Sequence, residues 1–265
     1  MKYAFLGAGK MASAIIQGML RGKDCAVSDI VAACPEPDLL ESLAKATSVR
    51  GVTSNEEAAT AGEVVLLCVK PADVAEAIWQ SGTGLAGKLL ISIVAGLPIE
   101  TLKELAPASR IIRAMPNAAA MVGCSATAFA ADDDATDDDL AVAEAVFSCI
   151  GKVYPVQEKM LNAVTGLSGS GPAYIFLVIE ALSDGGVAAG LPRKLSLDLA
   201  VQTVFGAAEM VAATSQHPAI LREMVTSPAG TTISGLAELE NRSVRSAFIE
   251  AVRVATGRAQ DIAGS

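Results

Sequence analysis

The chain of 265 residues is longer than a single hydrophobic core usually supports, so we expect two domains. Hydrophobic residues make up 52% of the chain and aromatic residues only 4%, which is typical of helices and buried parallel strands packed through Ala, Val, Leu and Ile. The formal net charge of −9 leaves no basic stripe to neutralise a phosphate backbone, so nucleic-acid binding is not expected.

The cysteines and the apolar runs indicate the compartment. Five widely spaced cysteines without a Cys-x-x-Cys pair predict neither a disulfide framework nor a zinc site. Gly7, Gly9 and Lys10 interrupt the first apolar run before a signal-peptide h-region forms. The most apolar runs, 89–97 and 173–182, reach about half of the ~20 residues that span a bilayer. We therefore expect a cytoplasmic protein with no membrane segment and no metal.

The first half of the chain alternates short apolar runs with segments of helical spacing. Residues 3–6 predict a strand, and a glycine turn then leads into a predicted helix over residues 11–20. This alternation is typical of βαβ units and predicts a parallel sheet. Further strands are predicted at residues 30–34, 64–69, 89–94 and 110–115.

Another helix is predicted to start at Thr136. Its hydroxyl can cap the free amides, and the three aspartates at residues 137–139 lie at the positive end of the helix dipole. Two aspartate triplets could also suggest a metal site, but helix capping and a solvated loop account for them better.

After Tyr154-Pro155 the sequence predicts helices only. The run 173–183 is apolar on nearly every face, with Gly185-Gly186 predicted to interrupt it and Gly190 to end it. The remaining predicted helices cover residues 193–214, begin at Pro218 and at Pro228, and end with a terminal helix over residues 242–262.

The change of pattern gives the predicted domains. We place a dinucleotide-binding domain at residues 1–161 and an all-helical domain at residues 162–265. The second domain has more apolar helix surface than about 100 residues can cover, so a subunit interface is expected to bury the remainder.

The glycines of Gly7-x-Gly9-x-x-Ala12 follow the first predicted strand and open a helix. In this context the first glycine permits a tight turn, the second lets the backbone approach a pyrophosphate, and Ala12 permits close packing of helix on strand. The phosphates then lie on the helix amides. The sequence therefore predicts a dinucleotide site.

The choice of cofactor depends on the end of the second strand, and two readings are open. Asp29 lies about 20 residues after the glycines, where an acid would bind a ribose 2′-hydroxyl. If residues 30–34 form the strand, Pro35-Glu36 takes that place instead. No Arg or Lys occurs between Asp24 and Ala44 to bind a 2′-phosphate, so the composition favours NAD without deciding the choice.

Motifs along the whole chain resemble those of the pyrroline-5-carboxylate reductases. The matching segments, in order, are Gly7-Ala8-Gly9-Lys10-Met11, Val69-Lys70-Pro71, Arg113-x-Met115-Pro116-Asn117, Leu167-Ser168-Gly169-Ser170-Gly171-Pro172, Asp184-Gly185-Gly186-Val187, Gly190-Leu191-Pro192-Arg193, His217-Pro218 and Ser227-Pro228-Ala229-Gly230-Thr231-Thr232. The resemblance implies reduction of 1-pyrroline-5-carboxylate to L-proline by hydride from NADPH or NADH, the last step of proline synthesis. It also implies a Rossmann-type parallel-sheet domain followed by an all-α dimerisation domain, in a homodimer that can assemble further.

The resemblance also implies roles for individual residues. Asn55 would bind the adenine-side ribose, and Thr232 would be catalytic, with its hydroxyl near the ring nitrogen of the imine. Family members commonly prefer NADPH. The implied sets are Leu6, Gly7, Ala8, Gly9, Lys10 and Met11 for the pyrophosphate, Val69, Lys70, Pro71, Ile93, Val94 and Ala95 for the nicotinamide side, and Ser227, Gly230, Thr231 and Thr232 for the substrate carboxylate.

Other readings of these residues remain open. Without the resemblance, Thr231-Thr232 would be read as caps of the following helix. Ala229 departs from the family, which often has a second glycine there. His217, the only histidine, is read as a residue at a helix start rather than as a catalyst. A related reductase of another cyclic imine or a keto acid, and a nucleotide-sensing homologue without turnover, are the alternative functions.

The remaining polar candidates have structural readings too. Lys70 is expected to shape the nicotinamide floor rather than to act as a catalytic amine, because proline follows it at a strand end. Arg113 and Asn117 could reach the substrate or the cofactor, or they could bond the loop around them.

Overall fold

The computed structural model describes residues 1–22 and 25–263. The chain forms two compact units, which we describe separately. Unit 1 contains Met1–Ser170 and the residues from Arg253 onward, and unit 2 contains Gly171–Val252. The division into domains at residues 161 and 162 stays a prediction.

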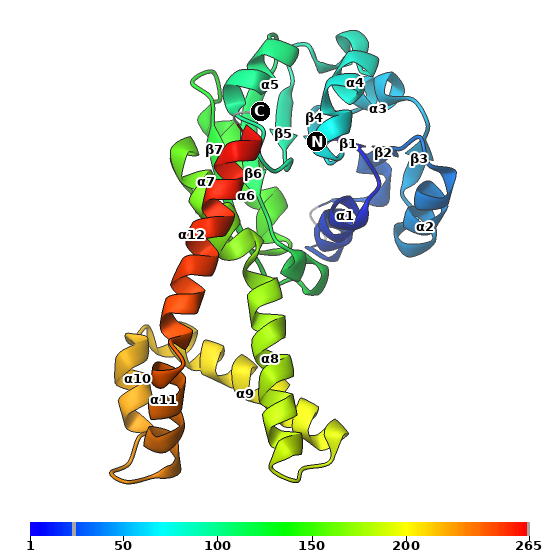
Figure 1. Cartoon of the computed structure of the whole chain (residues 1–265). Helices are drawn as coiled ribbons and strands as arrows, with labels where there is room; N and C mark the ends of the chain where they lie inside the picture. Colours follow the sequence, from blue (N-terminus) through cyan, green and yellow to red (C-terminus); the bar gives the residue numbers. More distant parts are fainter. Residues whose placement is uncertain (23–24, 264–265) are drawn as a thin grey trace. The chain divides into compact units, whose positions relative to one another are not determined.

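Unit 1 is built on a single sheet (Figure 1). In the described part of the chain, eight strands lie in the order β3-β2-β1-β4-β5-β6-β7-β8. The first six are parallel, β7 runs antiparallel to β6, and β8 runs parallel to β7. The order 3-2-1-4-5-6 is that of the doubly wound dinucleotide-binding fold. The strands are β1 Tyr3–Leu6, β2 Ile30–Ala33, β3 Arg50–Val52, β4 Val64–Leu67, β5 Leu89–Ser92, β6 Arg110–Met115, β7 Ser125–Ala131 and β8 Gly151–Pro155.

All five strands predicted from the sequence are present. β1 and β6 have the predicted bounds, whereas β2, β4 and β5 end one or two residues earlier than predicted. The sequence missed β3, β7 and β8. β3 has three residues of which two are exposed, and β8 is largely exposed at the sheet edge, so neither shows an apolar run. β7 is built mostly from Ala, Ser and Thr rather than from the large branched residues that favour strands.

Helices cover both faces of this sheet. Successive residues of β1 point to opposite faces, so Phe5 joins one buried apolar cluster while Ala4 and Leu6 join the other. The helices of unit 1 are α1 Lys10–Gly22, α2 Pro37–Thr47, α3 Asn55–Ala61, α4 Val74–Gln80, α5 Ile99–Leu105, α6 Asp137–Ser148 and α7 Leu161–Val164, which continues as a π-helical turn over Thr165–Gly169.

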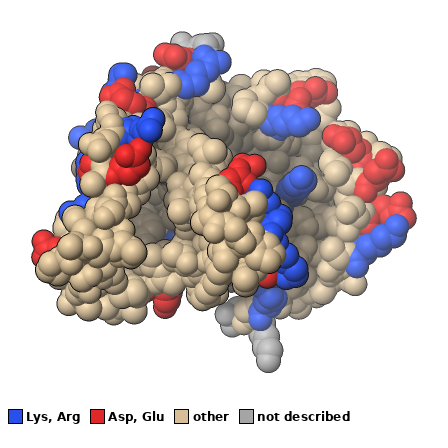
Figure 2. Space-filling view, turned by 60° about the horizontal axis from the view of Figure 1, so that its bottom comes forward, with Lys and Arg blue, Asp and Glu red and all other residues tan. Residues whose placement is uncertain are grey.

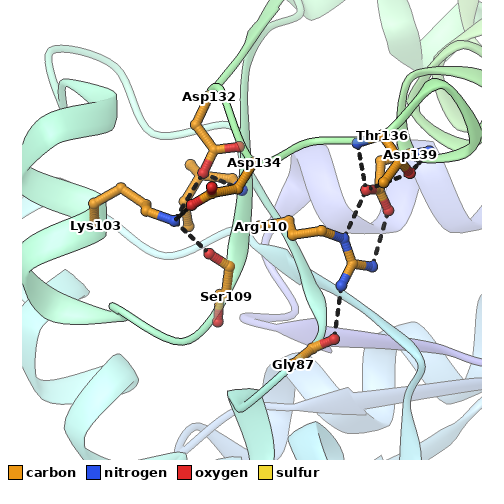
Figure 3. Close-up of polar contacts among 9 residues, drawn as sticks. Gly87, Lys103, Ser109, Arg110, Asp132, Asp134, Thr136 and Asp139 are labelled. Atoms are coloured by element: carbon orange, nitrogen blue, oxygen red, sulfur yellow. Dashed lines mark hydrogen bonds and ion pairs between the residues drawn. The ribbon is translucent and has the colours of Figure 1, made fainter.

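The start of α6 is fixed as the sequence predicted. The Thr136 hydroxyl accepts a hydrogen bond from the Asp139 amide at 3.2 Å, and the Asp139 carboxylate accepts one from the Thr136 amide at 2.9 Å. Arg110, at the start of β6, donates two further hydrogen bonds to this carboxylate, at 2.6 and 3.0 Å (Figure 3). The Arg110 guanidinium and these bonds hold the pKa of Asp139 at about 2. One carboxylate therefore ties α6 to the sheet.

Beside this pair, Lys103 of α5 binds the loop that follows β7. Its ammonium lies 3.1 Å from the Asp132 carboxylate and 2.6 Å from that of Asp134 (Figure 3). It also donates to the Ser109 carbonyl at 3.0 Å. Together the two basic residues use acids from both aspartate triplets as structural partners.

Unit 2 is helical, as the sequence predicted for this part of the chain. Its helices are α8 Gly171–Ala188, α9 Arg193–Thr214, α10 Pro218–Met224, α11 Thr231–Asn241 and the first part of α12 Val244–Ala263, whose later residues belong to unit 1. α9 has the predicted bounds, and Gly190 ends the preceding turn at φ +100°.

Two predicted helix boundaries in unit 2 are wrong. α8 continues through Gly185-Gly186, because Gly186 faces α9 so closely that a Cβ atom there would lie 2.1 Å from the Ser196 hydroxyl. That hydroxyl donates to the Ser183 carbonyl at 2.6 Å and joins the two helices. Pro228 does not open a helix either, since it lies in a turn and α11 begins at Thr231.

The paired helices α8 and α9 leave large apolar side chains exposed in the single chain. Phe176 is 65% exposed, Leu177 64% and Phe205 61%. Figure 2 shows wide uncharged areas between the charged groups. In the described part of the chain, α9 alone is long and apolar enough to cross a membrane, which for one helix is weak evidence. The sequence predicts that α8 is buried, but the single chain leaves most of its apolar side chains exposed.

We predict that Asp139→Asn lowers the free energy of unfolding by about 2 kcal/mol at pH 7. The native pKa lies below the unfolded value near 4, so this stability is present above pH 4 and disappears as the pH falls toward 2. Urea unfolding of both proteins across this range measures it. Asp137→Asn, an exposed neighbour in the same helical turn, is the control. An equal loss in the control, or a difference that persists at pH 2, would contradict the assignment.

Candidate functional site

The candidate cofactor site lies at the carboxyl edge of the sheet, between β1 and β4. Here the strand order reverses, and in open α/β sheets ligands bind at such a switch point. The Gly7 amide donates to the Ala33 carbonyl of β2 at 2.7 Å, and the Cys68 amide donates to the Leu6 carbonyl at 2.8 Å. These bonds hold the ends of β2, β1 and β4 together around a cavity of about 430 Å³.

The glycine turn fits a pyrophosphate. Gly7 has φ +105°, and a Cβ atom there would lie 2.6 Å from the Cys68 carbonyl oxygen, so no other residue fits without backbone movement. At Gly9 a Cβ atom would meet nothing within 4 Å, which leaves the backbone open to a ligand. α1 begins directly afterwards at Lys10, so the free amides of its first turn point toward this opening.

A row of polar side chains forms the wall toward α3 and α4. Asn55 is buried and donates to the Gln80 side chain at 2.9 Å, and Gln80 donates to Glu76 at 2.8 Å. These contacts fix the Asn55 amide beside the cavity. Three further residues at or within α4 line the cavity and were not predicted from the sequence: Asp73, Glu76 and Gln80. Their spacing of three and four residues after the Val69-Lys70-Pro71 motif was a usable signal.

The predicted cofactor residues gather at this one edge of the sheet. Leu6 is the buried last residue of β1, and Lys10 and Met11 begin α1. Ile93-Val94-Ala95 follow β5, which is hydrogen-bonded to β4, and Pro71 follows Lys70. The residues of the prediction that line the cavity itself are Gly7, Ala8, Gly9, Asn55, Val69 and Lys70.

One of the two readings of the second strand is now excluded. Asp29 precedes β2 and accepts a hydrogen bond from the Ala26 amide at 2.9 Å, at the opposite end of the strand from the cavity. Glu36 follows the carboxyl end of β2 and lines the cavity. Cys68 also lines it, and burial raises the pKa of its thiol, so this group stays protonated.

Arg113 and Asn117 bond to the protein around them. Arg113 is buried, and its guanidinium lies 3.0 Å from Glu158, whose carboxylate also accepts the Ile99 amide at 2.7 Å. Asn117 donates to the Ser168 carbonyl at 3.0 Å. This last bond joins two motifs that lie 51 residues apart in the sequence.

The candidate substrate loop lies in unit 2. The Gly230 amide donates to the Ser227 carbonyl at 3.1 Å, and a Cβ atom at Gly230 would lie 2.3 Å from the Ser227 hydroxyl oxygen. α11 begins at Thr231, and Gly230 precedes it without a side-chain cap. The reading of Thr231-Thr232 as capping residues is therefore wrong, because they are the first two helical residues. The amides of this first turn are suited to an anion.

Two neighbours of this loop also have defined conformations. Ala229 has φ +56°, in the left-handed region that favours glycine, which is the residue that the family often carries there. His217 caps α10, since its Nδ1 accepts the Ala219 amide at 3.2 Å. The predicted role of His217 at a helix start is confirmed.

Comparison with known proteins identifies relatives along the whole chain. The family model "Pyrroline-5-carboxylate reductase dimerisation" matches residues 158–262, and "NADP oxidoreductase coenzyme F420-dependent" matches residues 2–96. The pyrroline-5-carboxylate reductase of Synechocystis sp. is 46% identical over 257 residues, which cover 97% of this chain and 96% of the relative. That of Methanosarcina acetivorans is 41% identical over 263 residues, with 98% and 97% covered.

Solved structures agree with this result. The Coxiella burnetii pyrroline-5-carboxylate reductase superposes with a TM-score of 0.91 at 34% identity and covers 98% of both chains. The Plasmodium falciparum enzyme with NADP bound gives a TM-score of 0.90 at 31% identity, covering 99% of this chain and 98% of that one.

We predict that Gly9→Ala leaves the melting temperature unchanged, because the added methyl group meets no atom within 4 Å, yet lowers the affinity for NADH and NADPH by about tenfold or more. Fluorescence titration of the reduced nicotinamide measures the affinity. Gly257→Ala is the control for added side-chain volume, because a Cβ atom there, in α12, would also meet nothing within 4 Å. An unchanged affinity of Gly9→Ala for both cofactors would show that the pyrophosphate does not bind at this turn.

Proposed function

The chain belongs to the pyrroline-5-carboxylate reductase family, and on that premise we propose how its residues reduce 1-pyrroline-5-carboxylate to L-proline. The protein is an NAD(P)-dependent oxidoreductase that acts on the C=N bond of this cyclic imine, the last step of proline biosynthesis. The identity of 46% over nearly the full length carries the assignment. The glycine turn at the β1–β4 switch point supports it independently, since its geometry fits a dinucleotide.

The residues of unit 1 bind and orient the cofactor. We assign the pyrophosphate to the amides from Leu6 to Met11 at the start of α1, and the adenine-side ribose to Asn55. Val69-Lys70-Pro71 and Ile93-Val94-Ala95, at the adjacent ends of β4 and β5, border the nicotinamide. The bound nicotinamide supplies a hydride from its carbon 4 to the imine carbon.

The loop of unit 2 binds the carboxylate of the substrate. Ser227, Gly230, Thr231 and Thr232 offer hydroxyl and amide donors at the start of α11, where an anion needs no basic side chain. We assign the Thr232 hydroxyl to the ring nitrogen, which must gain a proton when the imine carbon gains the hydride. Orientation of donor and acceptor about 3 to 3.5 Å apart then lowers the entropic part of the barrier.

The protein assembles with copies of itself, as the dimerisation model over residues 158–262 indicates. We propose that the dimer contact lies on the exposed apolar side chains of α8 and α9, including Leu177 and Phe205. This contact also explains the apolar character of α9 without a membrane. A cytoplasmic location and the absence of a nucleic-acid partner complete the proposal, in agreement with the net charge of −9.

The assignment of function is tested by the oxidation of NADH and NADPH with three substrates: 1-pyrroline-5-carboxylate, its six-membered analogue and ketopantoate. We expect the five-membered imine to have the highest kcat/KM. Faster turnover of either other substrate would identify a related reductase instead. Cofactor binding without turnover of any of the three would indicate a nucleotide-sensing homologue.

We predict that Thr232→Ala lowers kcat by about 100-fold, the usual contribution of a positioned proton donor, while the Kd of the cofactor changes little. Thr232→Ser, which keeps the hydroxyl, should restore most of the rate. Steady-state kinetics and fluorescence titration give the two quantities. Equal turnover of Thr232→Ala and the unsubstituted protein would remove the assigned role.

We predict that Phe205→Glu lowers the oligomeric state in solution, because a charge placed in an apolar contact would have to be desolvated. Analytical ultracentrifugation measures the molar mass. Lys194→Glu, at a highly exposed position near the start of the same helix, is the control. An unchanged mass for Phe205→Glu would place the contact on another surface.

A further inference from the structure

The side of the cofactor cavity next to β2 is lined by an acidic residue and, among the described residues, by no basic residue. β2 ends at Ala33, whose carbonyl accepts the Gly7 amide at 2.7 Å, so the segment after β2 lies directly beside the glycine turn. From this segment Cys34, Pro35, Glu36 and Leu39 line the cavity. In the doubly wound fold this position faces the adenine-side ribose, where enzymes distinguish a 2′-hydroxyl from a 2′-phosphate.

This segment offers few hydrogen-bond donors to a phosphate. Pro35 and Pro37 have no N–H group. The amides of Leu39 and Leu40 already donate to the Glu36 carbonyl, at 3.2 and 3.3 Å. A 2′-phosphate would therefore find few main-chain donors at this helix start, and it would find no hydroxyl side chain between Cys34 and Asp38.

The charges of the segment are also unfavourable to a phosphate. Glu36 and Asp38 are exposed acids, and Glu36 lines the cavity together with Asp73 and Glu76. No basic residue follows in the sequence until Lys45, which pairs with Glu41 at 2.6 Å, and Arg50 pairs with Glu57.

Lys70 is the one base among the described residues that line this cavity, and it stands on the other side. It follows β4, whereas Glu36 follows β2, and β1 lies between these strands. Two strand spacings amount to roughly 10 Å. Lys70 is therefore placed toward the nicotinamide side rather than toward the adenine-side ribose.

We propose that Glu36 makes this enzyme prefer NADH to NADPH. The Glu36 carboxylate accepts a hydrogen bond from the ribose 2′-hydroxyl of NADH. It repels the 2′-phosphate of NADPH, which adds a charge of about −2 in a place without a compensating cation. The inference rests on the proposed function, because that function assigns the cavity to a dinucleotide.

The test measures the Kd of NADH and of NADPH by nicotinamide fluorescence, and kcat/KM for each with 1-pyrroline-5-carboxylate. We expect NADH to bind at least about tenfold more tightly, with the larger penalty for NADPH at low salt. Glu36→Gln should narrow the difference and weaken its dependence on salt. Glu36→Lys should reverse the preference.

Glu41→Gln is the matched control, since it removes the same charge within α2, the helix that Glu36 precedes, at a position that does not line the cavity. It should leave the ratio of the two Kd values unchanged. Equal or tighter binding of NADPH by the unsubstituted protein would overturn the proposal, as would a ratio that Glu36→Gln does not alter. If neither cofactor supports reduction of the imine, the proposed function fails, while the ratio of the two Kd values still decides the role of Glu36.

Discussion

The cofactor side of the protein depends on one close approach between backbone segments. The turn after β1 passes so near the end of β4 that only a glycine fits, with Gly7 at φ +105° and the Cys68 carbonyl where a side chain would lie. The same residue is hydrogen-bonded to the end of β2. The ends of β1, β2 and β4 are therefore held together around this turn. α1 starts directly after the turn, and its free amides are directed at the cofactor cavity.

In the proposed function, main-chain amides rather than basic side chains bind the two anionic ligands. The pyrophosphate is assigned to the start of α1 and the substrate carboxylate to the start of α11, where Gly230 precedes the helix without a side-chain cap. Such an arrangement would let a chain with a net charge of −9 bind anions. The choice between NADH and NADPH then depends on the charge near the adenine-side ribose, and Glu36 is the acid that lines the cavity there.

The sequence predicted the parts of the fold whose signals are local. The buried strands, the capped start of α6 at Thr136 and the bounds of α9 follow from apolar runs, a capping hydroxyl and Pro192. The errors arose where a contact distant in sequence decides the structure. Gly185-Gly186 remain helical because Gly186 packs against Ser196 of the next helix, and a window around the glycines contains no sign of that contact.

The candidate site was predicted with the same strengths and weaknesses. The glycine turn has a local signature, so the sequence alone predicts its residues. The choice between Asp29 and Glu36 required the exact end of β2, which apolar periodicity does not define. The place of Asp73, Glu76 and Gln80 beside the cavity was not predicted, because it depends on contacts between helices. Gln80 of α4 is hydrogen-bonded to Asn55 of α3, and a local window of sequence does not show that contact.

Isotope transfer follows the hydride itself from the dinucleotide to the imine carbon. The protein would be supplied with 1-pyrroline-5-carboxylate and NADH deuterated at both C4 positions, and the product would be analysed by mass spectrometry. We expect L-proline that carries one deuterium, bound to the former imine carbon. Proline without deuterium, or no proline at all with either NADH or NADPH, would contradict the proposed function.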